Sequence, residues 1–204
     1  MDQATRTEAL AKLAAIEARV GHPSKYTNYS SLKIDRQDLL GNVIRAKDFA
    51  WTLQLSRLGY PAVNYGAAGM LIGHELSHAF DTTGRHFDAT GKIRDWWTPT
   101  SAKRFEERTA QVIKQFGEFQ PLPSMNVNGK LTLGENIADL GGIQVAYAAY
   151  RRSVTRTGEP PVLDGLTGDQ RFFLSNAQSK REKVREGRLR EILLTNPHSP
   201  SAYA

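Results

Sequence analysis

The sequence predicts a mainly α-helical protein with little β-structure. Apolar residues recur at helical spacing in several long segments, turns rich in Gly and Pro separate these segments, and the alternating pattern typical of strands is scarce. The chain has 204 residues, of which 40% are hydrophobic. This is enough to bury the core of one domain, with or without an appendage.

Two helices are expected in the first 60 residues. The first covers residues 4–20, where apolar side chains are spaced for one helix face, and the sequence Gly-His-Pro then ends it. The second covers residues 39–58 and could be capped by Asp35. We therefore expect residues 1–60 to form an N-terminal helical segment and residues 61–204 to form the main domain.

Further helices are expected over 64–80, 98–117, 132–150 and 169–194. The first of these is rich in Gly, Ala and aliphatic residues around a charged centre, which is typical of a helix buried on most sides. Thr98-Pro99 is a helix start signal, and Thr132 can act as an N-cap. The last helix is expected to be interrupted near Gly187.

The charge and composition of the chain argue against two classes of binding partner, nucleic acids and membranes. The net charge is +6, and much of the surplus lies in the run KREKVREGRLR at 180–190, whose interspersed glutamates suit a solvated helix face. No aromatic stacking surface or known nucleic-acid module accompanies this run, so no nucleic-acid partner is expected. No contact with a membrane is expected either, because no long apolar run or signal peptide is present.

The segment GHELSHAF carries the residues of a hydrolytic metal site. On a helix, His74 and His78 lie one turn apart, so both imidazoles can bind one ion, and Glu75 lies beside them. The chain has no cysteine, so a metal must be held by His, Asp or Glu. Such a pattern also arises by chance on a solvated helix, but apolar residues flank this one, and unpaired charge is costly in a buried helix.

A third metal ligand must come from another segment, and GENIAD offers Glu135. Asp139, one helical turn later, is placed to accept the outer N–H of a ligand histidine, which we assign to His74. Both acids could instead belong to an ordinary acidic helix face. Their neighbours are apolar or small, however, so burial of both acids requires a reason.

Five segments in order resemble the motifs of neprilysin-like zinc endopeptidases, which are of the gluzincin type: NYGAAGMLIGHELSHAFD, GKIRDWWT, VNGKLTLGENIADLGG, GDQRFFLSNAQ and NPHSP. The resemblance extends from about Asp35 to the end of the chain. It implies a zincin-like, thermolysin-like catalytic core over residues 61–204 that binds one Zn²⁺. The implied ligands are His74, His78 and Glu135, with Glu75 as the general base and Asp139 behind a ligand.

The resemblance also gives a role to His198 in the NPHSP motif. From the residues alone, a solvated histidine near the end of the chain is the favoured interpretation. The corresponding family histidine stabilises the oxyanion formed during peptide hydrolysis, so the resemblance implies this catalytic role for His198.

The chain departs from the family pattern in three places. Ala204 stands where the family carries an arginine that grips the substrate, an Asn-Ala-Tyr type strand is missing between Gly59 and Asn64, and the large helical domain that encloses the catalytic chamber has no counterpart. We therefore expect a C-terminally truncated catalytic domain. No substrate-binding residue is identified.

The leading hypothesis is a zinc-dependent endopeptidase that cleaves oligopeptides with a metal-activated water. The alternatives are a zinc-binding remnant with little activity and a non-enzymatic interaction protein. Surface left exposed by the missing segments could drive self-association. The resemblance favours a periplasmic or extracellular location.

Overall fold

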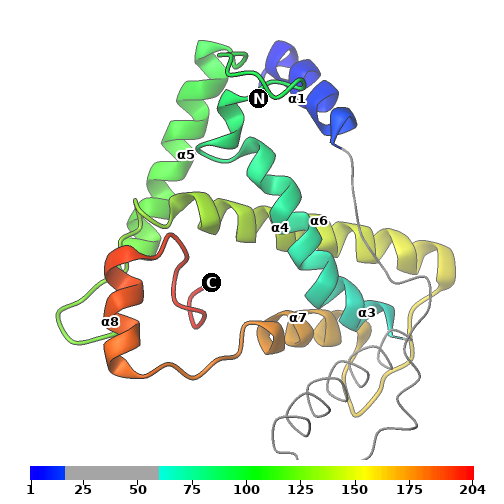
Figure 1. The fold of residues 1–204 in the computed structure, drawn as a ribbon. Helices are drawn as coiled ribbons and strands as arrows, with labels where there is room; N and C mark the ends of the chain where they lie inside the picture. Colours follow the sequence, from blue (N-terminus) through cyan, green and yellow to red (C-terminus); the bar gives the residue numbers. More distant parts are fainter. Residues whose placement is uncertain (17–59) are drawn as a thin grey trace, which may run out of the picture.

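A computed structural model describes residues 1–16 and 60–204, and within these ranges the protein is helical (Figure 1). The only β-structure among these residues is three isolated bridges, so the predicted mainly α-helical fold is confirmed. The predicted helix over 39–58 and its cap at Asp35 lie outside the described residues. The elements are α1 (Gln3–Ala15), α3 (Pro61–Asn64), η3 (Tyr65–Gly69), α4 (Met70–Ser77), η4 (His78–Phe80), η5 (Gly84–His86), α5 (Pro99–Gly117), α6 (Leu133–Thr157), α7 (Gly168–Ser179) and α8 (Glu186–Thr195).

The helix expected over 64–80 is one continuous helical run from Pro61 to Phe80. It begins three residues earlier than expected because Pro61 occupies its first turn, where the missing N–H costs nothing. The five-residue segment η3 within it is π-helical, and α4 and a final 3₁₀ turn follow. Single π-helical turns are frequent near functional sites in proteins.

Helices α4 and α6 form the most extensive helix contact among the described residues, and they cross near the centre of the molecule (Figure 1). Glycines permit this close approach. A Cβ at Gly73 would lie 2.7 Å from Gly142 O, and one at Gly142 would lie 2.6 Å from His74 N. The backbones therefore touch at the point where α4 carries its histidines.

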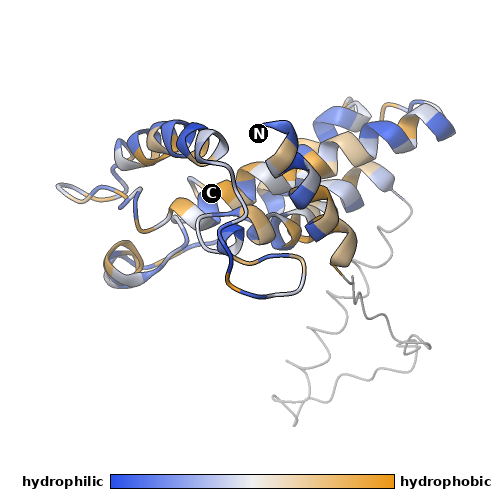
Figure 2. Cartoon of the chain, turned by 90° about the horizontal axis from the view of Figure 1, so that it is seen from above, coloured by the Kyte–Doolittle hydropathy of each residue, from blue (hydrophilic) through white to orange (hydrophobic). Residues whose placement is uncertain are grey.

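Two groups of buried residues flank this crossing. One joins α3, α4, α6 and α7 and consists of Ala62, Met70, Ala146, Tyr150, Val154 and Phe172. The other joins α5, the loop after it and α8 and is centred on Phe116, Val127 and Leu193. Hydrophilic and hydrophobic residues alternate along the peripheral helices, as expected for elements with one solvated face (Figure 2).

Helix α1 differs from the prediction in length and in the face that it buries. It ends at Ala15, whereas the sequence predicted a helix to residue 20, of which the part after residue 16 is not described. Leu10 and Leu13, expected to face the core, are 56% and 48% exposed, whereas Thr5 and Lys12 are buried. Specific polar contacts to other elements, rather than apolar spacing, determine its orientation.

The later helices match the prediction in order but not in every boundary. Helix α5 begins after Thr98, whose hydroxyl accepts from Ser101 N, and ends at Gly117 as predicted. Helix α6 continues to Thr157, and the Thr132 side chain makes no capping bond because it pairs with the polar groups of Asn128 and Asn136 instead.

The break in the last helical stretch lies at residues 180–185, whereas Gly187 is inside the first turn of α8. The basic run is thus part connector and part helix. Arg188 pairs with Glu191 and Arg190 with Glu186. None of the helices in the described part of the chain is long and apolar enough to cross a membrane.

Candidate metal centre

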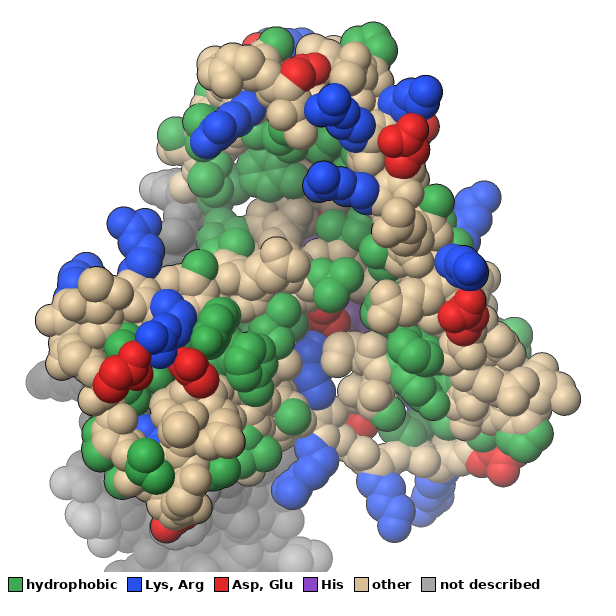
Figure 3. Space-filling view, turned by 180° about the vertical axis from the view of Figure 1, so that it is seen from behind, with side chains coloured by type: hydrophobic (Ala, Val, Ile, Leu, Met, Phe, Trp, Pro, Cys, Tyr) green, Lys and Arg blue, Asp and Glu red, His purple; other side chains and the backbone are tan. Residues whose placement is uncertain are grey.

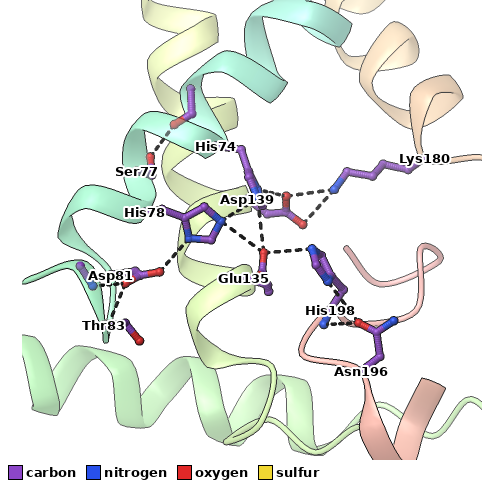
Figure 4. A network of polar contacts seen from close by, with 12 residues as sticks. His74, Ser77, His78, Asp81, Thr83, Glu135, Asp139, Lys180, Asn196 and His198 are labelled. Carbon is purple, nitrogen blue, oxygen red and sulfur yellow. Dashed lines mark hydrogen bonds and ion pairs between the residues drawn. The ribbon is translucent and has the colours of Figure 1, made fainter. Parts of the chain in front are cut away.

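The structure brings His74, His78 and Glu135 together at the crossing of α4 and α6 (Figure 4). One potential ligand atom from each residue lies within 4.8 Å of the other two. His74 is buried and the other two are half-buried. The two imidazoles come from successive turns of one helix and the carboxylate from the first turn of the other.

Each imidazole is held on its far side by a carboxylate. His74 Nδ1 lies 2.7 Å from Asp139 Oδ1, and His78 Nδ1 lies 2.7 Å from Asp81 Oδ2. Because an ionised carboxylate only accepts hydrogen bonds, each Nδ1 carries a proton. In the neutral rings, both Nε2 atoms therefore present a lone pair to the interior of the site.

Three electron-rich atoms converge on one point. The two Nε2 atoms lie 3.1 Å apart, and Glu135 Oε2 lies 3.3 Å from that of His74 and 3.4 Å from that of His78. Glu135 Oε2 is buried and receives no well-formed hydrogen bond from any described residue. Lone pairs in this arrangement repel one another, and a buried carboxylate oxygen without a well-formed hydrogen bond is costly, so a cation bound at this point would stabilise the site.

The donor set fits zinc. Zinc in proteins is bound tetrahedrally at about 2.0–2.2 Å by imidazole nitrogen and carboxylate oxygen, which separates neighbouring ligand atoms by about 3.3 Å. The spacings of 3.1, 3.3 and 3.4 Å agree with this value. Three protein ligands also leave a fourth position open, which is typical of catalytic rather than structural zinc sites.

Asp139 stands where the sequence predicted it, behind His74, and Lys180 holds it there. Lys180 Nζ lies 2.9 Å from both Asp139 oxygens at the C-terminal end of α7. Lys180 was not predicted as part of the site, because no local sequence pattern relates it to a residue 41 positions away.

Asp81 was also missed, although its position three residues after His78 at a helix end was a usable signal. Its second oxygen accepts N–H bonds from Thr83 and Gly84 at 2.8 and 2.7 Å. Burial lowers the pKa of His78, but the hydrogen bond to Asp81 and the charge of Glu135 outweigh it. The net result is a raised pKa for His78.

Glu75 is exposed beside this cluster on α4. It makes no hydrogen bond or ion pair with the other described residues, and its negative charge contributes to the raised pKa of His78. Its carboxylate is therefore close to the three convergent atoms without being tied to any of them, which leaves it able to accept a proton.

His198 reaches the same site from the C-terminal segment. Its Nε2 lies 3.1 Å from Glu135 Oε2, and its side chain is 59% exposed. The adjacent Ser199 is buried and donates to Asn136 Oδ1 at 2.8 Å, which ties this segment to α6. The structure thus brings His198 to the same place as the five residues predicted from the two segments GHELSHAF and GENIAD.

Two hollows open beside the cluster. One is bounded by His78 and Glu135 together with the side chains of Ile113, Lys130 and Leu133. The other is bounded by Asp139, Lys180, His198 and Ala204. From behind, acidic, basic and histidine side chains are visible within a central depression of the surface (Figure 3).

The chain is similar in sequence to known zinc metallopeptidases. The chain is 43% identical to Neprilysin-11 of Caenorhabditis elegans over 146 residues, which is 70% of the chain and 17% of that protein. It is 44% identical to endothelin-converting enzyme 1 of Bos taurus over 144 residues, 70% of the chain and 19% of that protein. The chain therefore spans less than a fifth of the length of these curated relatives.

Solved structures extend the likeness to the fold. The zinc metalloprotease ZMP1 of Mycobacterium tuberculosis, solved with an inhibitor, matches all of this chain with a TM-score of 0.78 and 35% identity, over 38% of its own length. PepO of Lactobacillus rhamnosis matches 98% of this chain with a TM-score of 0.69 and 27% identity, over 37% of its own length. Residues 56–204 match Peptidase family M13. Because this match covers most of the sequence, the chain belongs to Peptidase family M13, the neprilysin-like zinc metallopeptidases.

Proposed function

We propose that residues 61–204 form the catalytic part of a zinc-dependent endopeptidase that cleaves oligopeptides. The observation that carries the proposal is the convergence of two lone-pair nitrogens on a buried oxygen of Glu135 that receives no well-formed hydrogen bond from the described residues. His74, His78 and Glu135 would hold one Zn²⁺. An extracellular or periplasmic location stays a prediction from the resemblance.

The family resemblance supports roles for the surrounding residues, and their positions in the structure are compatible with these roles. When bound, zinc supplies Lewis acidity, which polarises a peptide carbonyl and makes water acidic near neutral pH. Glu75, which is exposed and has no ion pair with the residues that the structure describes, accepts the proton of the attacking water and passes it to the leaving amine. His198 donates from Nε2 to the carbonyl oxygen as that oxygen gains negative charge, and it does so as the doubly protonated ring, because its Nδ1 faces the accepting amide oxygen of Asn196.

The test pairs metal analysis with cleavage of an internally quenched peptide. Wild-type protein should contain one zinc per chain and lose activity with a chelator. Glu75→Gln should keep the zinc and lose activity by roughly 10²–10⁴-fold, because a general base contributes about that factor. Glu135→Ala should lose the zinc.

Glu107→Gln is the matched control, since Glu107 is an exposed glutamate on α5. It should leave both zinc content and cleavage unchanged. Absence of zinc from the wild-type protein, or full activity in Glu75→Gln, would contradict the proposal.

A second candidate is a zinc-binding protein with little turnover. It is favoured by Ala204, which lines the hollow beside His198 where the resemblance leads one to expect a substrate-binding arginine. One zinc per chain without measurable peptide cleavage would select this alternative.

A further inference from the structure

Lys12, a residue of α1, is almost fully buried. Its side chain reaches the end of the helical run 61–80, which carries the two histidines. Only 8% of the residue is exposed. Its Nζ donates to Ala79 O and, at 2.5 Å, to Gly84 O. Burial of an ammonium group is costly unless its donors are satisfied and its charge is compensated, so this placement requires a reason.

The place that Lys12 occupies is suited to a cation. Ala79 is in η4, the last turn of the helical run 61–80, where carbonyl groups lack helical partners and the helix dipole is negative. Side chains of lysine commonly satisfy such carbonyls from within the same helix. Here the cation comes from a different helix, α1, 67 positions earlier in the chain.

Aromatic rings and acids complete the surroundings of the ammonium group. Nζ lies 5.4 Å from the ring centre of Phe80 and 5.7 Å from that of Trp96, within the range of cation–π attraction. Burial lowers the pKa of Lys12, whereas the charges of Asp81 and Asp88 act in the opposite direction.

Gly84 connects Lys12 to the metal centre. Its carbonyl accepts from Lys12, and its N–H donates to Asp81 Oδ1 at 2.7 Å. The other oxygen of Asp81 holds His78 Nδ1, also at 2.7 Å. A Cβ at Gly84 would overlap His78 O, so the turn lies directly against the helix end.

We propose that Lys12 is a positioning residue for the metal centre: from α1 it closes the turn 79–84 and thereby holds Asp81 in place against His78. The inference rests on the proposed zinc site. Helix α1 contributes no metal ligand, but through Lys12 it would control the orientation of the His78 imidazole. Without the lysine, the turn loses the hydrogen bonds to the carbonyl groups of Ala79 and Gly84.

Zinc affinity of the full chain is the measurement, determined by competition with a fluorescent chelator. Loss of a group that orients a ligand from behind typically weakens metal affinity by 10–100-fold, and Lys12→Met, which acts one step further away, should weaken it by roughly 10-fold. Lys103→Met, at an exposed lysine of α5, is the matched control and should have no effect.

A double-mutant cycle with Asp81→Asn separates positioning from general stabilisation. If Lys12 acts through Asp81, then Lys12→Met should change zinc affinity little once Asp81 is replaced, because coupled residues are not additive. The melting temperature of the zinc-free protein, in contrast, should fall with Lys12→Met in both backgrounds.

Two outcomes would overturn the inference. One is zinc binding by Lys12→Met at wild-type affinity, whether or not the melting temperature falls, and the other is an equal loss of affinity in both backgrounds. Failure of the wild-type protein to bind zinc would instead refute the proposed function. If Lys12→Met does not fold, Lys12→Gln, which keeps an N–H donor without the charge, takes its place in the same cycle.

Discussion

The two histidines of the metal centre depend on carboxylates that are held in different ways. Asp81 is fixed by backbone N–H groups of its own turn, whereas Asp139 is fixed by the ammonium group of Lys180. Asp139 is 13% exposed and Lys180 26% exposed. A charge pair that is this shielded from water couples its two members strongly, so removal of one partner affects the other.

This pairing predicts that Asp139→Ala alone weakens zinc binding more than Asp139→Ala combined with a substitution of Lys180. Asp139→Ala should weaken zinc binding by about 10–100-fold, because His74 loses its hydrogen-bond acceptor. It also leaves the positive charge of Lys180 unpaired close to the metal. The double variant Asp139→Ala/Lys180→Met should therefore bind zinc more tightly than Asp139→Ala alone, though less tightly than wild type.

The measurement is again chelator competition, with Asp95→Ala at an exposed loop residue as the control. Equal affinity of the single and double variants would show that Lys180 has no electrostatic influence on the site.

At the residue scale, the sequence was sufficient to predict which side chains lie together where the spacing between them is local. The four-residue spacing of His74 and His78 and that of Glu135 and Asp139 each fix two side chains on one helix face, and the structure places all four together. It failed for Lys180, whose partner is distant in the chain, because only tertiary packing brings the two together.

At the scale of the element, the start of a helix was predictable where a capping residue is present in the local sequence, as at Thr98. The break between α7 and α8 at residues 180–185 was not predictable, because these residues are good helix formers. The break lets Lys180 face Asp139 and lets Leu193 of α8 pack against Phe116 of α5. Tertiary contacts thus override local propensity. The burial of Lys12 in place of Leu10 has the same cause.

The close crossing of α4 and α6 predicts that Gly73 cannot be replaced. In an exposed helix, Gly→Ala is stabilising by roughly 0.5–1 kcal/mol. At Gly73 the new methyl group would meet Gly142 backbone atoms at 2.7–3.2 Å, so the helices must move apart. Gly73→Ala should lower the melting temperature and weaken zinc binding, since the movement separates the histidines from Glu135.

Gly187→Ala is the matched control, because Gly187 lies in α8 and a Cβ there would meet no atom within 4 Å. It should maintain or raise the melting temperature and leave zinc affinity unchanged. Thermal unfolding followed by circular dichroism, with and without zinc, distinguishes the two variants. Wild-type affinity in Gly73→Ala would show that the crossing does not set the ligand geometry.

At the scale of the whole molecule, large hydrophobic side chains lie exposed on helices α4 and α7. On α4 and α7 these are Leu71, Ile72, Phe173 and Leu174, which are 58%, 45%, 48% and 45% exposed. Exposed apolar patches commonly mark a contact with another protein or segment. Contact between copies of the chain is one interaction that would cover these side chains.

We therefore expect the protein to self-associate. Its elution volume in size-exclusion chromatography should decrease as the loaded concentration rises, because burial of apolar surface stabilises contacts between chains by roughly 25 cal/mol per Å². Leu174→Glu should shift the protein toward the monomer, since a charge at such a contact is costly to bury. Ile93→Glu, at an 81% exposed loop residue away from these helices, is the control and should leave the elution profile unchanged. A monomeric elution volume at every concentration would contradict self-association, and equal shifts with both variants would place the contact elsewhere than on α7.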